Sequence, residues 1–202
     1  MKPPPLEDPI VAIGMDPDLA VATIAAVSLI NGQWKLLGVA AVKTKGRPTF
    51  KSDKPLLALD GIRQAVWDFR CVCPQACVVA VESQQDYGAG KTESPADLIR
   101  LGQAAGMALA LASEYWDEAN LMLPMPQAWK GSVSKAVHQA RVFVKMNIPF
   151  ETRGGMAPYA VPLDRMGLTM GDWKHAADSV GLAVWAAEQT AWERVKQRAL
   201  AR

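Results

Sequence analysis

Two short apolar runs, each followed by a carboxylate, constrain this chain more than any other feature of its sequence. The run from Ile10 to Met15 is followed by Asp16, and the run from Val78 to Val81 is followed by Glu82. Continuous apolar runs of this length are typical of strands that are buried on both faces of an α/β sheet. Because α/β sheets place their chemistry at strand ends, we predict that both acids lie at a functional edge.

A histidine and a further acid near the C-terminus complete a candidate metal site. His175 and Asp178 stand three positions apart in a segment with helical character, so their side chains face the same side of that helix. An α/β sheet and its closing helix can bring both to Asp16 and Glu82. Mg²⁺ prefers hard oxygen ligands and keeps part of its water shell, whereas an imidazole ligand favours Mn²⁺ somewhat more.

Such a group of side chains is suited to phosphodiester hydrolysis. Two neighbouring cations can activate the attacking water and stabilise the leaving oxygen, and His175 would serve as a ligand or as a proton carrier. The alternative is that each acid is merely solvated or caps a turn. That alternative fits a lone strand-end aspartate better than it fits four residues beside apolar segments. We therefore predict a metal-dependent nuclease.

The remaining sequence pattern predicts an α/β fold. Asn31-Gly32 is a strong hairpin signal, so three N-terminal strands are expected to be antiparallel neighbours. Ser94-Pro95 is typical of a helix N-cap and first helical position, and Asp172 is expected to cap the last helix. We expect strands at 11–15, 20–30, 33–42, 78–81 and 121–123, helices at 55–71, 95–116, 132–146 and from 172 onward, and a long irregular segment at 149–171.

Length and composition favour a single domain. With 202 residues and 50% hydrophobic content, the chain can bury one substantial core, which we expect over residues 10–202 after a flexible, proline-rich lead-in at 1–9. We expect no secretory signal, and the apolar stretches are shorter than the ~20 residues of a membrane span. Cys71, Cys73 and Cys77 lack a fourth nearby ligand, so we expect packing residues in a cytoplasmic protein and no zinc site.

Contacts to nucleic acid are expected from a local basic patch, because the net charge of +2 is low for a DNA-binding protein. Lys130, Lys135 and Arg141 follow the expected fifth strand, where they can approach a scissile phosphate and neutralise developing charge. Lys135 is the first candidate for a catalytic lysine, with Lys130 next. For Arg141 a solvated helix face is an equally good interpretation.

The Gly- and Gln-rich loop after Glu82 offers a second candidate DNA contact. Tyr87 can stack on a base while Lys91 meets a phosphate. The same loop suggests a nucleotide-binding P-loop, but that motif requires a glycine where this chain has Gln85. Four residues also separate the loop from the next helix N-terminus, so we do not expect nucleotide binding.

In the order of its motifs the chain resembles the RuvC family of Holliday junction resolvases, which have a ribonuclease-H-like fold. The likeness extends over most of the chain, in the segments Ile13 to Pro17, Val79 to Glu82, Leu101 to Gly106, Pro126 to Lys130, Ser134-Lys135 and His175 to Ser179. It implies a five-stranded mixed sheet with three antiparallel N-terminal strands and helices on both faces. Asp18 departs from the family's usual glycine and places another acid near the metals.

The resemblance also implies an activity and its partners. The residues expected to act in catalysis are Asp16, Glu82, His175, Asp178, Lys135 and Lys130, of which the first four would hold Mg²⁺ or Mn²⁺. The residues expected to contact DNA are Tyr87, Lys91, Lys130, Lys135 and Arg141. We expect a homodimer, formed through helix 95–116, that nicks four-way DNA junctions symmetrically in a bacterial cell or a phage-infected host.

Other activities remain compatible with the sequence. A ribonuclease-H-like nuclease could act on flaps, forks or RNA hybrids, and a noncatalytic protein could bind junctions without cutting them. An actin-like ATPase is disfavoured, because such proteins need two related domains and this chain has room for one.

Overall fold

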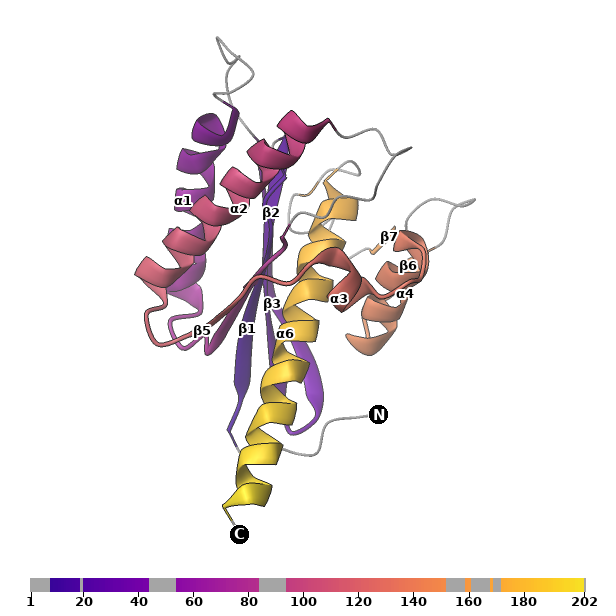
Figure 1. The fold of residues 1–202 in the computed structure, drawn as a ribbon. Coiled ribbons are helices and arrows are strands. Elements are labelled where there is room, and N and C mark those ends of the chain that lie inside the picture. The colour runs from indigo at the N-terminus through magenta and orange to yellow at the C-terminus, as the bar shows by residue number, and fades with distance from the viewer. Residues whose placement is uncertain are drawn as a thin grey trace.

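A five-stranded mixed sheet forms the centre of the molecule (Figure 1). The computed structural model describes residues 8–18, 20–43, 54–83, 94–151, 159–160, 168 and 172–201. The strands are β1 (Ile10–Asp16), β2 (Val21–Ile30), β3 (Gln33–Lys43), β4 (Val78–Val81) and β5 (Asn120–Met122), and their order across the sheet is β3-β2-β1-β4-β5. β1, β2 and β3 are antiparallel neighbours, whereas β4 runs parallel to β1 and β5 runs parallel to β4.

The hairpin between β2 and β3 forms where the sequence predicts it. Asn31 and Gly32 have φ values of 50° and 75°, the left-handed backbone that the favoured two-residue hairpin turns require. Glycine adopts this backbone without steric cost, and asparagine tolerates it better than most residues. The turn therefore fixes the antiparallel register of the first half of the sheet.

Helices cover both faces of the sheet, as predicted (Figure 1). α1 (Lys54–Val72) and α2 (Pro95–Tyr115) pack together on one face, and α6 (Trp173–Leu200) lies along the other. The short α3 (Pro126–Lys130) and the longer α4 (Lys135–Lys145) pack against α6. β6 (Phe150–Glu151) and β7 (Tyr159–Ala160) form a separate two-stranded sheet.

Strand alternation divides the apolar side chains between two cores. In β1, Ile10 and Ala12 face α6, whereas Val11, Ile13 and Met15 face α1 and α2. The whole of β1 is buried, which explains why the run that precedes Asp16 is apolar without interruption. Both cores are built from side chains of β1, β2 and β4, so these strands hold the two layers of helices together.

Several sequence predictions need correction at element ends. Pro126 begins the short helix α3, because proline fits a first helical position, and α4 begins at Lys135, three residues later than predicted. Ser94 caps α2 as expected, accepting a hydrogen bond from the Asp97 amide. The Asp172 side chain makes no capping hydrogen bond, and instead its Oδ2 lies 3.2 Å from Lys43 Nζ. The segment predicted as irregular contains β6 and β7 among its described residues.

No described helix combines the length and the apolar character that a membrane span requires. Residues 1–7 of the predicted lead-in lie outside the described residues. The extent of the domain over residues 10–202 stays a prediction.

Candidate active site

Strand alternation directs the two strand-end acids to the same face of the sheet. Side chains two and four residues apart in a strand point to the same face of the sheet. Asp16 therefore lies on the same face as Ala12 on β1, and Glu82 lies on the same face as Val78 and Ala80 on β4; this is the face that α6 covers. The parallel register pairs Met15 with Val81, and the Glu82 amide donates a 2.9 Å hydrogen bond to the Met15 carbonyl. The two carboxylates therefore leave adjacent strand ends on the α6 side.

A close contact between α6 and β1 brings the C-terminal residues to these acids. A Cβ atom at Gly14 would clash with the Ser179 carbonyl and lie 2.6 Å from the Ala183 amide nitrogen, so the helix backbone rests directly on the strand. The Ser179 hydroxyl accepts a 3.2 Å hydrogen bond from the Asp16 amide and lies 2.6 Å from the Thr23 hydroxyl. This hydroxyl pair joins β1, β2 and α6, the elements that carry three of the four candidate ligands.

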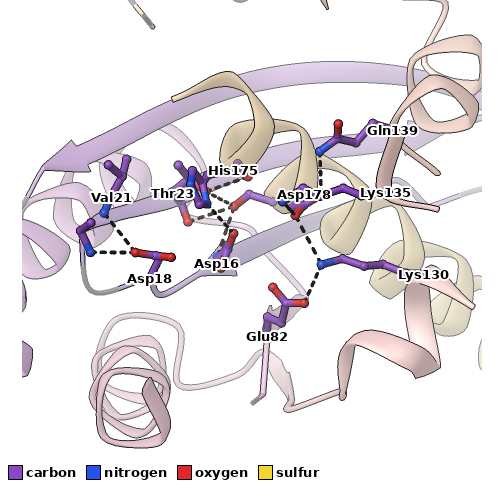
Figure 2. Close-up of polar contacts among 12 residues, drawn as sticks. Asp16, Asp18, Val21, Thr23, Glu82, Lys130, Lys135, Gln139, His175 and Asp178 are labelled. Carbon is purple, nitrogen blue, oxygen red and sulfur yellow. Dashed lines mark hydrogen bonds and ion pairs between the residues drawn. The ribbon is translucent and has the colours of Figure 1, made fainter. Parts of the chain in front are cut away.

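The three carboxylates are buried, and two of them, Glu82 and Asp178, contact lysines (Figure 2). Asp16, Glu82 and Asp178 are 8%, 6% and 1% exposed. Lys130 Nζ lies 2.8 Å from Glu82 Oε1 and 3.3 Å from Asp178 Oδ2, and Lys135 Nζ lies 2.5 Å from Asp178 Oδ2. Figure 2 shows these side chains directed toward one another from β4, α3, α4 and α6.

His175 pairs with the first acid of the cluster. Its Nδ1 lies 3.4 Å from Asp16 Oδ2, and its backbone carbonyl accepts a 2.9 Å hydrogen bond from the Thr23 hydroxyl. The helical spacing predicted from the sequence thus places His175 toward Asp16 and Asp178 toward the lysines. Asp16, Glu82, His175 and Asp178, together with Lys130 and Lys135, occupy one region, while their chemical roles stay a prediction.

Negative charge dominates this region. Burial, and then the neighbouring Asp16 carboxylate, raises the pKa of Glu82 to about 7, although Lys130 acts in the opposite direction. Burial works to lower the pKa of Lys130, but Asp178 and Glu82 outweigh it, so that pKa is raised overall. The cluster therefore stabilises positive charge and disfavours a full set of ionised acids.

The side chains of this cluster offer the kind of donor atoms that a hard divalent cation prefers. Their ion pairs with the two lysines partly determine where the carboxylate oxygens lie. Carboxylate oxygens are the ligands that Mg²⁺ prefers, and a cation would offset both the burial and the repulsion from Asp16 that raise the pKa of Glu82. Within the described residues, however, no three His, Cys, Asp or Glu side chains gather closely enough to hold a metal. Lys130 Nζ contacts both Glu82 and Asp178 and so bridges these two carboxylates.

Two buried residues that the sequence analysis did not identify support the cluster. Trp129 places its ring 4.4 Å from Lys130 Nζ, a cation–π contact that adds to the ion pairs of that lysine. Gln139 is fully buried, and its Nε2 donates a 2.9 Å hydrogen bond to Asp178 Oδ1. Gln139 is four residues after Lys135, so the face of α4 that carries the predicted lysine could have indicated it.

Four further residues were singled out from the sequence, and their proposed roles stay predictions. Tyr87 and Lys91 lie outside the described residues, and their DNA contacts stay predictions. Arg141 is exposed and lines a surface groove between α4 and the β2–β3 hairpin. Asp18 Oδ1 accepts a 2.7 Å hydrogen bond from the Ala20 amide, so this acid is engaged in the turn after β1 (Figure 2).

The fold is shared with solved Holliday junction resolvases. Thermus thermophilus RuvC in complex with a Holliday junction substrate is 18% identical, with a TM-score of 0.62 over 92% of this chain and 96% of that one. A further T. thermophilus RuvC structure is 18% identical, with a TM-score of 0.58 and coverage of 93% and 97%. The yeast mitochondrial Holliday junction resolvase is 12% identical, with a TM-score of 0.59 and coverage of 98% and 86%.

No family model and no curated protein sequence matches the chain. At these low identities, the structural likeness shows only that the chain shares the fold of these resolvases, as the sequence predicted. The activity has to be argued from the site itself.

Proposed function

We propose that this protein is a metal-dependent endonuclease that resolves four-way DNA junctions by symmetric nicking. The observation that carries the proposal is the group of three buried carboxylates, Asp16 and Glu82 at the ends of β1 and β4 and Asp178 on α6, of which Glu82 and Asp178 contact two lysines. The likeness in fold to Holliday junction resolvases supports the choice of substrate.

Each residue of the cluster has a role that follows from its position. Asp16, Glu82 and Asp178 would hold a divalent cation, with His175 as a further ligand or as a proton carrier beside Asp16. When bound, the cation would supply an activated water molecule and stabilise the leaving oxygen of the phosphodiester. We expect Mg²⁺, or Mn²⁺ in its place, because the donors are mainly carboxylate oxygens.

The two lysines differ in exposure, and this difference separates their roles. The Lys135 side chain is 45% exposed, so its ammonium can turn from Asp178 toward a phosphate oxygen and neutralise charge that develops there. The Lys130 side chain is only 19% exposed and contacts Glu82 and Asp178 together. Lys130 therefore stays with the carboxylates and limits their mutual repulsion.

The proposal is tested with a labelled synthetic four-way junction incubated with the protein in Mg²⁺, in Mn²⁺ and in EDTA. We expect paired nicks that leave 5′-phosphate and 3′-hydroxyl ends when a metal is present, and intact junction in EDTA. Asp16→Asn should bind the junction without nicking it, because the substitution removes a ligand and leaves the basic residues in place. Full nicking by this variant in Mg²⁺ would refute the proposal.

The same preparation separates the alternatives. Preferential cutting of flaps, forks or RNA–DNA hybrids would assign the protein to another kind of ribonuclease-H-like nuclease. A noncatalytic junction-binding protein would retain all of its activity in EDTA. These substrates should be assayed side by side at equal protein concentration.

Symmetric nicking needs two active sites, and we propose that α2 forms the contact of a homodimer. Ile99 on α2 is 64% exposed, and Gly102 and Gly106 have open space where a side chain would project, so another helix can approach closely. A two-fold dimer is the simplest assembly that presents two sites to two equivalent strands. Sedimentation equilibrium of the wild type and of Ile99→Asp tests this contact. A wild-type monomer at assay concentrations would exclude it.

A further inference from the structure

Gln139 is placed in the interior of the molecule beside the candidate metal site (Figure 2). It belongs to α4, is fully buried, and its Nε2 donates a 2.9 Å hydrogen bond to Oδ1 of Asp178. Burying a side-chain amide is unfavourable unless it is hydrogen-bonded. A carboxylate accepts hydrogen bonds and an amide NH₂ group donates them, so the observed orientation matches donor to acceptor.

The two oxygens of Asp178 have different kinds of partner. Oδ2 is contacted by the ammonium groups of Lys130 and Lys135, whereas Oδ1 is held by the neutral amide of Gln139. The terminal torsion of an aspartate is broad, so one contact alone leaves the carboxylate free to rotate. Contacts at both oxygens fix its plane.

The lysines cannot fix that plane by themselves. An ammonium group is a rotatable point charge on a flexible stem, and the Lys135 side chain is 45% exposed. Gln139, by contrast, is itself fully buried, and it contacts Asp178 from a helix that packs against α6. It also restrains Asp178 without neutralising the negative charge that a cation needs.

We propose that Gln139 is a positioning residue that fixes the Asp178 carboxylate, so that Oδ2 stays directed toward the Glu82 side of the cluster and is ready to bind a divalent cation. This inference rests on the proposed metal-dependent function. Residues that orient ligating carboxylates typically contribute a factor of roughly 10 to 100 to metal affinity or activity.

The test is Mn²⁺ binding by the full chain, measured by calorimetry or electron paramagnetic resonance in the absence of DNA. Gln139→Met removes the donor and keeps the side-chain length, and we expect it to raise the Mn²⁺ dissociation constant by roughly 10- to 100-fold. Gln64→Met is the matched control, since Gln64 makes the same kind of 2.8 Å contact with Asp68 on the exposed face of α1. Its Mn²⁺ affinity should equal that of the wild type.

Nicking of the junction gives an independent readout. Gln139→Met should need a correspondingly higher Mg²⁺ concentration for half-maximal nicking, while its junction affinity in EDTA stays that of the wild type. A merely structural role would lower thermal stability and leave the Mn²⁺ affinity of the folded protein unchanged. Gln139→Asn keeps the amide but is one methylene too short to reach Asp178, and it replaces the methionine variant if that variant does not fold.

The outcomes distinguish this inference from the function on which it rests. If the wild type binds Mn²⁺ and nicks junctions, and a folded Gln139 variant has the wild-type Mn²⁺ affinity, the positioning role is overturned while the proposed function stands. If the wild type neither binds Mn²⁺ nor nicks junctions, the proposed function itself fails, and the role of Gln139 fails with it.

Discussion

Replacing Glu82 with glutamine should stabilise the protein at alkaline pH in the absence of metal, although it removes a proposed metal ligand. Burial and the nearby Asp16 raise the pKa of Glu82 in the folded protein to about 7, from an ordinary value of 4.5. Below about 4.5, Glu82 is protonated in the folded and unfolded states and the shift has no effect. Between the two values only the folded state keeps the proton, so folding stability falls as pH rises.

The magnitude follows from the same difference in pKa. At about 1.4 kcal/mol per pH unit, the wild type loses roughly 3 kcal/mol from this group by the time the pH has passed 7. A glutamine side chain carries no charge at any pH, so the Glu82→Gln variant should escape that loss. For a chain of this length, the gain corresponds to a melting temperature higher by roughly 6 to 12 °C at about pH 8.5 and to little change at about pH 5.

The assay is thermal or urea unfolding in EDTA across this pH range, with wild type, Glu82→Gln and Glu118→Gln compared. Glu118 is exposed on the surface, so its variant should follow the wild-type curve and report any general effect of losing a charge. Added Mg²⁺ should then stabilise the wild type more than Glu82→Gln, because a ligand has been removed. Parallel curves for wild type and Glu82→Gln, or a variant less stable than the wild type at the alkaline end of the range, would refute the account of the cluster's charge.

Two further substitutions test the packing and the chemistry of the site. Gly14→Ala should destabilise the protein by about 3 kcal/mol or more, because the added Cβ would meet the backbone of α6 at Ser179 and Ala183. Gly102→Ala is the control, since its added Cβ would enter open space, and it should be neutral or slightly stabilising. Equal unfolding midpoints for the two variants would contradict the close contact between α6 and β1. Lys135→Ala should slow single-turnover nicking by roughly 100-fold or more, and a wild-type rate in the folded variant would remove this lysine from the chemistry.

The sequence determined the strands and the positions of their terminal acids. An uninterrupted apolar run fits a strand that is buried on both faces, and β1 and β4 have this environment throughout. The side-chain period of two then places Asp16 and Glu82 on the same face once the parallel register is set. The turn at Asn31-Gly32 and the cap at Ser94 were likewise predictable, because they depend on neighbouring residues alone.

Only the tertiary structure decided which groups surround each acid. Lys130 contacts Glu82, which lies 48 residues earlier in the sequence, and Asp178, which lies 48 residues later. Gln139 contacts Asp178 over a sequence separation of 39 residues. Asp172, predicted as a cap, pairs with Lys43 on β3 instead. Such contacts depend on how α3, α4 and α6 are rotated and placed against the sheet. Local patterns cannot specify that placement, since it is set by packing between distant segments, such as the contact of α6 with Gly14.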